Sequence, residues 1–330
     1  MIRFATIGTN FVADWFVDAA ARSGQLEYKG TYSRSMEKAE EFGKKHGSTL
    51  FFDDLEKLAE CKEIDAVYVA SPNSEHFKQA MLMITHGKHV LIEKTMASNA
   101  EEVCLLIEAA KENQVVLMEA VRQIYDPGFK AIEEAIKEIA PVRRASFQYC
   151  QYSSRYDKFK NGIVENAFNP EFSNGALTDI GVYCVHPLVK LFGMPKEIFA
   201  QAIILPDSID GEGTIIVKYD DMLADVTYSK ISDGKIPSQI QGEKGTITIE
   251  DIPNPRTVTT YYRDGSVKKS NIPYTDNNME FEAAEWARMI NEDDFSDRHS
   301  QYSLMALKLM DEARRQQNIV FPADADINKK

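Results

Sequence analysis

The sequence predicts an α/β protein of two domains. A doubly wound parallel sheet is expected in residues 1–120, and an α+β domain with a large, mostly antiparallel open sheet in residues 121–330. The length of 330 residues suits about two domains at ~150 residues each. Strand and helix patterns alternate up to about residue 120, which is typical of a parallel sheet with helices on both faces. Beyond that point strand patterns follow one another across short turns.

The N-terminal elements follow in a regular order. Strands are expected over residues 2–8, 27–33, 49–52, 65–71, 88–94 and 115–121. Helices are expected after Asn10, over 35–47, after the Asp53-Asp54 cap, over 74–87 and over 98–114, where Ser98 and Glu101 fit a capping box. The carboxyl ends of parallel strands share one edge, so we expect ligands to bind there.

The C-terminal elements begin with a helix over 127–140 and a long strand over 142–152. A polar loop leads to a helix at about 178–192. Strands are then expected over 198–205, 213–219, 222–230, 237–241, 245–250 and 257–263, and helices over 277–291 and 300–317. Apolar residues fall on both faces of the strands at 203–205 and 215–217, which favours a partner subunit against the open sheet.

Composition and charge exclude several classes of function. The net charge of −13 argues against a binder of nucleic acid or acidic membranes, because such partners need a basic face. No apolar run approaches the ~20 residues of a membrane span. The strand that starts at Ile2 leaves no room for a signal peptide. Cys61, Cys104, Cys150 and Cys184 are far apart, as expected for free thiols in the cytoplasm, and no metal-ligand spacing is present.

The first strand-to-helix turn, "IGTNFVADWF" (7–16), lies where a Rossmann dinucleotide fingerprint belongs. Gly8 suits the tight turn and Ala13 suits close helix packing. Asn10 replaces the middle glycine; asparagine tolerates left-handed geometry but carries a side chain. The pattern predicts a dinucleotide site, and an ordinary strand–helix turn stays the alternative.

The second strand ends in Ser33-Arg34 instead of the acidic residue that would bind a free ribose 2′-hydroxyl. A hydroxyl and a guanidinium suit a 2′-phosphate through charge-assisted contacts. The sequence therefore favours NADP(H) over NAD(H), with NAD(H) still possible. A surface arginine without a ligand is the alternative.

A second polar group lies in "NPEFSNGALTDIGVYCVHPLVKLFG" (169–193). Asp179, Tyr183 and His186 are four and three residues apart, so they share one face of a helix. Pro187 is expected to disturb that helix. The three side chains suit a catalytic site, although hydrogen bonding at a domain boundary explains the spacing equally well.

The sequence resembles the glucose–fructose oxidoreductase / inositol dehydrogenase (Gfo/Idh/MocA) family over nearly its whole length. The resemblance is strongest to the branch of dimeric dihydrodiol dehydrogenases and NADP-dependent xylose dehydrogenases, in which a tyrosine stands where inositol dehydrogenases place histidine. The motifs that carry it are residues 8–13, "ASPNSEH" (70–76), "GKHVLIEK" (87–94), "MEAV" (118–121), "SSRYDKF" (153–159) and "NGALTDIGVY" (174–183).

The family resemblance implies an NAD(P)-dependent oxidoreductase that forms dimers or tetramers through its C-terminal sheet. It also implies a catalytic lysine in an E-K-P motif, which is Lys94 here. Thr95 departs from the proline of that motif, and Asn174 replaces the first glycine of a Gly-Gly pair. These departures put the local backbone in question more than the chemistry.

By position in the family motifs, further residues are expected to contact the cofactor or, more weakly, the substrate. Pro72-Asn73 is equally a good helix entry, His76 a surface or capping residue, and Arg155 and Tyr156 an exposed loop. The expected cofactor contacts are Gly8, Thr9, Asn10, Phe11, Ser33, Arg34, Ser71, Pro72, Asn73, His76, Glu93, Lys94 and Arg122, and the expected substrate contacts are Arg155 and Tyr156.

The resemblance predicts hydride transfer between nicotinamide and a CH–OH or C=O carbon of a sugar, polyol or cyclic diol. Tyr183 is the expected base, and His186 is the alternative base or a substrate contact. A free phenol titrates near pH 10, so it needs a nearby cation. An ammonium at ~4 Å supplies about 4 kcal/mol at an effective dielectric of ~20, which Lys94 would provide while polarising the substrate oxygen. Asp179 is expected to orient the substrate or Lys94.

Two other functions stay open at this point. A binding protein that senses NADP(H) without turnover would have the same fold, and a structural dimerisation module would bind no cofactor. Retention of Lys94, Asp179 and Tyr183 argues against the sensing protein, which does not need that set of residues.

Overall fold

The computed structural model describes residues 1–327, which form two compact units. The first unit contains residues 1–122 and 276–304, and the second contains residues 123–275 and the chain from Met305 onward. The division differs from the expected boundary in one respect. Residues 276–304, which the sequence placed in the second domain, pack with the first unit.

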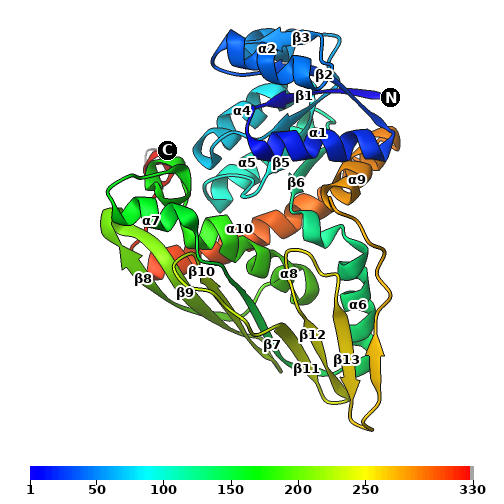
Figure 1. Ribbon diagram of the computed structural model, residues 1–330, viewed down its shortest axis with the longest axis vertical. Coiled ribbons are helices and arrows are strands. Elements are labelled where there is room, and N and C mark those ends of the chain that lie inside the picture. The colour runs from blue at the N-terminus through cyan, green and yellow to red at the C-terminus, as the bar shows by residue number, and fades with distance from the viewer. Residues whose placement is uncertain (328–330) are drawn as a thin grey trace. The chain divides into compact units, whose positions relative to one another are not determined.

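The first unit is built on a sheet of six parallel strands within residues 1–122 (Figure 1), as predicted. Its strands are β1 (Ile2–Ile7), β2 (Leu26–Tyr32), β3 (Leu50–Phe52), β4 (Ala66–Val69), β5 (His89–Glu93) and β6 (Leu117–Ala120), and its helices up to residue 122 are α1 (Phe11–Ser23), α2 (Met36–Lys45), α3 (Leu55–Glu60), α4 (Asn73–Thr85) and α5 (Ala100–Glu112). The strand order is β3-β2-β1-β4-β5-β6. The direction of winding therefore reverses between β1 and β4, which is where ligands bind in such sheets.

Helix α5 begins one residue later than the sequence suggested. The cap is Asn99, whose side-chain oxygen accepts a hydrogen bond from the Glu102 N–H at 3.0 Å. The carboxylate of Glu102 in turn accepts from the Ser98 N–H at 2.9 Å. The cap thus lies at Asn99 instead of Ser98, because asparagine caps a helix about as well as serine does, and Glu102 binds the N–H of the residue before the cap.

Residues 276–304 add the helix α9 (Met279–Asn291) and the start of α10 (Arg298–Gln316) to the first unit. Trp286 on α9 is fully buried, and its ring lies 6.5 Å from that of Phe4 on β1 and 6.3 Å from that of Phe16 on α1. A large aromatic side chain buried in this way anchors α9 against the parallel sheet.

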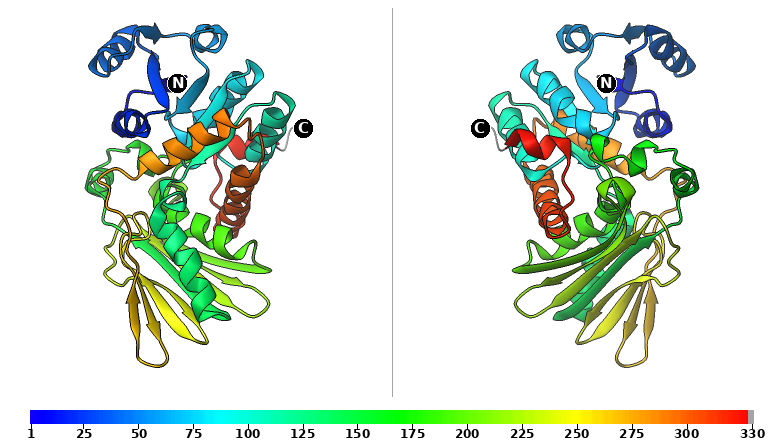
Figure 2. Two further views of the ribbon diagram at one scale, coloured as in Figure 1. Left: turned by 90° about the vertical axis from the view of Figure 1, so that its right-hand side faces the viewer. Right: turned by 90° about the vertical axis from the view of Figure 1, so that its left-hand side faces the viewer.

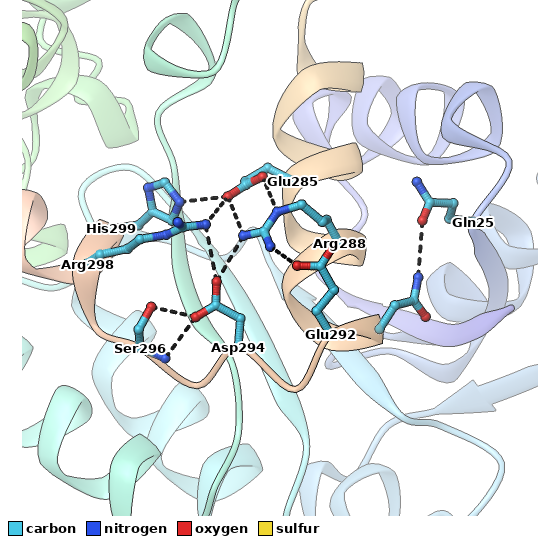
Figure 3. A network of polar contacts seen from close by, with 9 residues as sticks. Gln25, Glu285, Arg288, Glu292, Asp294, Ser296, Arg298 and His299 are labelled. Carbon is cyan, nitrogen blue, oxygen red and sulfur yellow. Dashed lines mark hydrogen bonds and ion pairs between the residues drawn. The ribbon is translucent and has the colours of Figure 1, made fainter.

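The turn between α9 and α10 is closed by a network of charges in the first unit (Figure 3). Glu285 accepts hydrogen bonds from Arg288, Arg298 and His299, and Asp294 accepts from both arginines. Burial alone would raise the pKa of Glu285, but the bonds from His299 and Arg288 outweigh it and bring the pKa well below its usual range. The network therefore fixes the path by which the chain leaves α9.

The second unit contains a mixed sheet of eight strands within residues 123–275, mostly antiparallel as predicted (Figure 1). Its strands are β7 (Val142–Cys150), β8 (Glu197–Leu205), β9 (Ile209–Lys218), β10 (Leu223–Ser229), β11 (Ser238–Gly242), β12 (Gly245–Ile249), β13 (Val258–Tyr262) and β14 (Val267–Lys269). The order is β14-β13-β12-β11-β7-β10-β9-β8, and only the β7–β10 pair runs parallel among these. The sequence missed the short edge strand β14 and the helices α7 (Ser154–Lys160) and α11 (Pro322–Ile327).

Helices cover one face of this sheet (Figure 2). Helix α6 (Pro127–Ile139) lies on β11 to β13, and α8 (Val182–Phe192) lies on β7 and β10. On the other face Phe199, Ile203 and Ile216 are exposed, with 57%, 53% and 49% of their surface accessible. Their neighbours Ile215 and Val217 are fully buried, so the strands alternate between a packed face and an open apolar face.

Within residues 1–327, no helix combines the length and the apolar character needed to cross a membrane.

Candidate functional site

The loop after β1 lies where the winding of the parallel sheet reverses. Gly8 has a φ of 114°, a region that residues with a side chain rarely adopt. A Cβ atom on Gly8 would lie 2.8 Å from the carbonyl oxygen of Ala70, which follows β4. The ends of β1 and β4 are therefore so close that only glycine fits at position 8, and the backbone of the loop stays open to a ligand.

Asn10 stabilises this loop in a way that the sequence did not suggest. Its backbone is extended, with φ −84° and ψ 175°, so the left-handed geometry allowed for it is not used. Its side-chain oxygen accepts hydrogen bonds from the Val12 and Ala13 N–H groups at 3.1 and 3.0 Å. Its amide nitrogen donates to the Ala70 carbonyl at 2.8 Å. Asn10 thus caps α1 and joins the first helix to the end of β4.

Beyond β2, Ser33 and Arg34 lead into the capping residue of α2, Ser35. The Arg34 side chain is exposed, and among the described side chains no ion pair uses its guanidinium. A nearby hollow of about 560 Å³ separates Thr9 from one face of α2, and it is lined by Thr9, Lys38, Glu41, Phe42 and Lys45. Two lysines and one glutamate therefore line the hollow next to the phosphate loop.

The segment after β4 contains Ser71, Pro72, Asn73 and His76. Pro72 is the capping residue of α4, and the Ser71 hydroxyl donates to Gln79 at 2.6 Å. His76 is fully buried, with its Nδ1 2.8 Å from the Thr95 carbonyl and its Nε2 2.9 Å from the Ser71 carbonyl. Burial lowers the pKa of His76, so a neutral ring connects the loops that follow β4 and β5. This placement differs from the surface or capping position considered for it.

Strand β5 ends in Glu93, which is followed by Lys94 and Thr95. Glu93 accepts hydrogen bonds from the Tyr68 hydroxyl and, at 3.3 Å, from the Lys94 N–H. Burial raises the pKa of Glu93, opposed by the Tyr68 bond and the nearby Lys94 and Arg122 charges. The peptide bond between Lys94 and Thr95 is cis, although residue 95 is not proline. The half-buried Lys94 thus follows β5 on the same sheet edge as the phosphate loop.

In the second unit, a π-helical turn (η4, Leu177–Gly181) precedes α8. Its start is held by the buried Asp210 of β9, which accepts hydrogen bonds from the Leu177 N–H at 2.7 Å and from the Ala176 N–H. A Cβ on Gly175 would lie 2.1 Å from Asp210 Oδ1. Gly175, the first glycine of "NGALTDIGVY", is therefore needed because a side chain there would clash with the Asp210 carboxylate that caps the turn. Such π turns are frequent at functional sites.

Asp179 lies within this π turn and forms an ion pair with Lys230, the residue after β10. Asp179 is 24% exposed and Lys230 is 3% exposed, measured on their side chains. The sequence expected Asp179 to orient the substrate or Lys94. The cation that it contacts within its own unit is Lys230.

Tyr183 is partly exposed on the first turn of α8. Its ring meets that of Tyr149 on β7 edge to face, with the centroids 5.7 Å apart. Its backbone carbonyl accepts a hydrogen bond from the Gln123 side chain at 3.3 Å. His186, three residues further, is only 1% exposed. The π turn and α8 therefore bring Asp179 and Tyr183 to the accessible face and place His186 in the interior.

The two weaker substrate candidates lie on α7. Arg155 faces Glu165 at 3.5 Å, and Glu165 also pairs with Lys158. Tyr156 packs against a small apolar cluster that includes Phe159 and Phe168. Both residues have protein partners, and their contact with a substrate stays a prediction.

Sequence reasoning missed Lys230, Asp210 and Tyr149. Each lies on or beside a strand of the second unit and reaches the π turn or α8 through sheet pairing. A lysine after a strand is usually solvated, and no spacing along the chain singles these residues out. Only the antiparallel register of β9 with β10, which pairs Glu212 with Ser229, brings Asp210 and Lys230 to the same end of the sheet.

Comparisons with known proteins cover nearly the whole chain. A model described as "Oxidoreductase family, NAD-binding Rossmann fold" matches residues 2–121, and one described as "GFO/IDH/MocA C-terminal domain" matches residues 131–248. The chain is 48% identical over 326 residues to scyllo-inositol 2-dehydrogenase (NADP(+)) IolU of Bacillus subtilis (strain 168), covering 98% of this chain and 99% of that protein. It is 29% identical over 310 residues, 89% of each protein, to trans-1,2-dihydrobenzene-1,2-diol dehydrogenase of Danio rerio.

Solved structures share the fold at low sequence identity. Levoglucosan dehydrogenase in complex with NADH and levoglucosan matches with a TM-score of 0.84 at 19% identity, over 96% of this chain and 98% of that one. KijD10, a 3-ketoreductase from Actinomadura kijaniata in complex with NADP and TDP-benzene, matches with a TM-score of 0.84 at 21% identity, over 96% of this chain and 97% of that one. The parallel sheet, the phosphate loop and these matches agree, and the chain belongs to the Gfo/Idh/MocA family of oxidoreductases.

Proposed function

We propose that this chain is an NADP-dependent dehydrogenase that acts on a CH–OH carbon of a polyol, sugar or cyclic diol, or as a reductase in the reverse direction. The observation that carries the proposal is the 48% identity, over 98% of the chain, to a relative named as an NADP⁺-dependent scyllo-inositol dehydrogenase. The more distant relative named as a dihydrodiol dehydrogenase acts on another CH–OH substrate, which supports the same class of reaction.

The first unit fits a dinucleotide. The glycine cradle at residue 8 keeps side-chain atoms away from the loop before α1, so a pyrophosphate can approach its backbone. Ser33 and the exposed Arg34 suit a 2′-phosphate, which favours NADP(H) over NAD(H). When bound, the nicotinamide accepts or donates the hydride of the reaction.

The chain's own residues supply the proton chemistry in this proposal. During oxidation, the substrate carbon loses hydride and its hydroxyl loses a proton to Tyr183, which leaves a carbonyl group. Lys94 favours ionisation of Tyr183 and polarises the substrate oxygen through its positive charge. The accessible position of Tyr183 and the 1% exposure of His186 support the tyrosine as the base.

A regulatory protein that binds NADP(H) without turnover is the second candidate. Asn10 and Thr95, which depart from the family pattern, motivated it. The hydrogen bonds of Asn10 give that residue a structural role in the loop, so it no longer favours a loss of activity. The presence of Lys94, Asp179 and Tyr183 together supports the enzyme.

We also propose that the protein works in the cytoplasm as a homodimer or tetramer assembled through the open face of the eight-stranded sheet. The exposed apolar residues on that face support this assembly. The net charge of −13 supports small-molecule substrates over nucleic acids or acidic membranes.

The test is turnover by the wild-type protein and three variants, followed as NADPH formation with scyllo-inositol and a panel of sugars and cyclic diols. Lys94→Met and Tyr183→Phe are each expected to lower kcat by ~10²–10⁴-fold, the usual cost of losing an acid–base group. His186→Asn is expected to have a much smaller effect on kcat.

If Lys94→Met and Tyr183→Phe both retained near wild-type turnover, the mechanism would be refuted. If the wild-type protein bound NADPH tightly but oxidised no member of the panel, the sensing protein would replace the enzyme as the better proposal.

A further inference from the structure

Lys230 is the feature of the second unit that the proposed mechanism leaves unexplained. Its side chain is 3% exposed, yet it carries an ammonium group that pairs with the Asp179 carboxylate. The ammonium also donates to the Ala167 carbonyl at 3.3 Å and lies 4.8 Å from the centre of the Phe168 ring. Burying an ion pair is costly, and apolar residues of similar volume often serve stability equally well. The pair therefore calls for a functional explanation.

The two members of the pair are not equally accessible. Lys230 is too deeply buried to touch a ligand, whereas Asp179 is 24% exposed. A carboxylate has two oxygens with several acceptor positions, so it can accept hydrogen bonds from more than one donor. Asp179 can therefore accept a further hydrogen bond from a group outside the protein while Lys230 holds it from behind.

Hydrogen bonds of the backbone fix the positions of Lys230 and of the turn that carries Asp179. The Lys230 N–H donates to the Gly211 carbonyl and its own carbonyl accepts from the Ser153 N–H, both at 2.9 Å. Asp179 lies in the π turn whose first N–H groups are bound by Asp210. The position of the carboxylate is thus set by the sheet on one side and by the capped helix on the other, which is the arrangement a binding site needs to be preorganised.

We propose that Lys230 is a positioning residue, which keeps the Asp179 carboxylate charged and oriented to accept a hydrogen bond from a second hydroxyl of the substrate. Tyr183 lies four residues further along the same helical segment, next to Asp179 on its accessible face. The substrate class that this arrangement selects is a diol or polyol with a hydroxyl beside the reacting CH–OH carbon. This inference rests on the proposed function.

The experiment compares Lys230→Met, Lys230→Arg, Asp179→Asn and the double variant Lys230→Met/Asp179→Asn. Lys88→Met is the matched control, because Lys88 is also buried but lies in the first unit, with its ammonium 2.7 Å from the carbonyls of Cys61 and Ile64. Each protein is assayed for kcat and KM with scyllo-inositol and with an analogue that lacks the hydroxyl beside the reacting carbon. The affinity for NADPH is measured separately.

Lys230→Met is expected to lower kcat/KM for scyllo-inositol roughly 30-fold or more at pH 7, because it leaves a partly buried carboxylate without its cation. Its activity should rise with pH, since such a carboxylate ionises only at higher pH. Lys230→Arg should recover part of the activity by restoring the charge. The kcat/KM of the double variant should no longer depend on pH in this way. It should also fall by less than the product of the fold-losses of the two single variants.

Binding of NADPH should stay within about 2-fold in all variants, because the phosphate loop lies in the other unit. The analogue should have a low kcat/KM with the wild-type protein, and Lys230→Met should leave that kcat/KM unchanged. A Lys230→Met protein that matched Lys88→Met in stability and kept wild-type kcat/KM would overturn the inference and leave Lys230 a structural residue.

A failure of the proposed function gives a different result. The wild-type protein would then oxidise no polyol, and calorimetric binding of scyllo-inositol would decide the inference instead. Weaker binding to Lys230→Met than to wild type would support a positioning role, whereas equal binding, or none to either protein, would refute it.

Discussion

At the residue scale, one amide side chain replaces a glycine in the phosphate loop. Asn10 satisfies the Val12 and Ala13 N–H groups, which a helix start would otherwise leave unpaired, and its amide nitrogen ties the loop to Ala70. The loop gains a cap and a link between β1 and β4. The glycine at position 8 remains indispensable because the Ala70 carbonyl would lie 2.8 Å from a Cβ there.

The predicted preference for NADP(H) over NAD(H) depends on Arg34. Arg34→Ala is expected to weaken NADPH binding ~10–100-fold, the range for losing hydrogen bonds to a charged group, and to leave NADH binding nearly unchanged. Fluorescence titration with both cofactors measures the ratio of the two affinities. Lys44→Ala is the control, because Lys44 is an exposed lysine on α2 that pairs with Glu40. An identical ratio before and after Arg34→Ala would remove the argument for the 2′-phosphate.

At the scale of elements, hydrophobic periodicity predicted the parallel strands and most helices correctly. Strand β5, expected over 88–94, spans His89–Glu93, and α6, expected over 127–140, spans Pro127–Ile139. The elements that it missed, such as β14 and α7, are short and lack an apolar repeat. The packing of α9 in the first unit could not be predicted from the sequence. Its contacts with Phe4 and Phe16 join residues more than 250 positions apart, and no local pattern encodes such a pairing.

Helix α9 also carries a buried carboxyl group that has no part in the proposed mechanism. Glu282 is fully buried, and neither carboxylate oxygen has a hydrogen-bond partner among the described residues. Burial raises the pKa of Glu282 well above its ordinary value, and the nearby Glu93 charge adds to the effect. Burial therefore favours the neutral form of Glu282 in the folded protein, so folding favours proton uptake.

This proton uptake predicts a stability that depends on pH. Below the unfolded pKa of about 4.5 the carboxyl is protonated in both states, so it adds no pH dependence to the free energy of unfolding. As the pH rises above that value, the unfolded chain ionises first, and folding loses about 1.4 kcal/mol per pH unit until the folded pKa is reached. Glu282→Gln should thus raise the melting temperature at pH 8 and change it little at pH 4.5.

Thermal unfolding of Glu282→Gln across pH 4.5–8 tests this expectation. Glu280→Gln on the same helix is the control, because Glu280 is partly exposed. Equal destabilisation by Glu282→Gln at every pH would show instead that the carboxylate is ionised and paired in the folded protein.

At the scale of the whole molecule, the candidate site was predictable only in part. Motifs that are contiguous in sequence, such as the phosphate loop and the Lys94 strand end, could be located because each follows a recognisable strand. Lys230 could not, because its contact with Asp179 depends on the pairing of β9 with β10 and on the π turn that holds Asp179. Helical spacing predicted Asp179, Tyr183 and His186 on one face, whereas the structure buries His186.

The open face of the eight-stranded sheet gives the last prediction. Ile216 pairs with the exposed Phe199 of β8 and with the partly exposed Asp225 of β10, so it lies on the open face between these two strands. Exposed apolar side chains on adjacent strands favour association with a second subunit. We expect the wild-type protein to have at least twice the chain mass of 37.3 kDa when measured by light scattering.

Ile216→Lys should shift the protein toward the monomer without lowering its melting temperature, because a charge placed in an apolar interface loses its hydration on association, whereas the same charge is solvated in the isolated chain. Ile163→Lys is the control, since Ile163 is also exposed but lies in the turn after α7, away from the sheet. If the wild-type protein were a monomer, or if Ile216→Lys kept the wild-type mass, assembly through this face would be excluded. A shift of Ile216→Lys alone would locate the subunit contact on the β8–β10 part of the sheet, on the face opposite the helix that carries Tyr183.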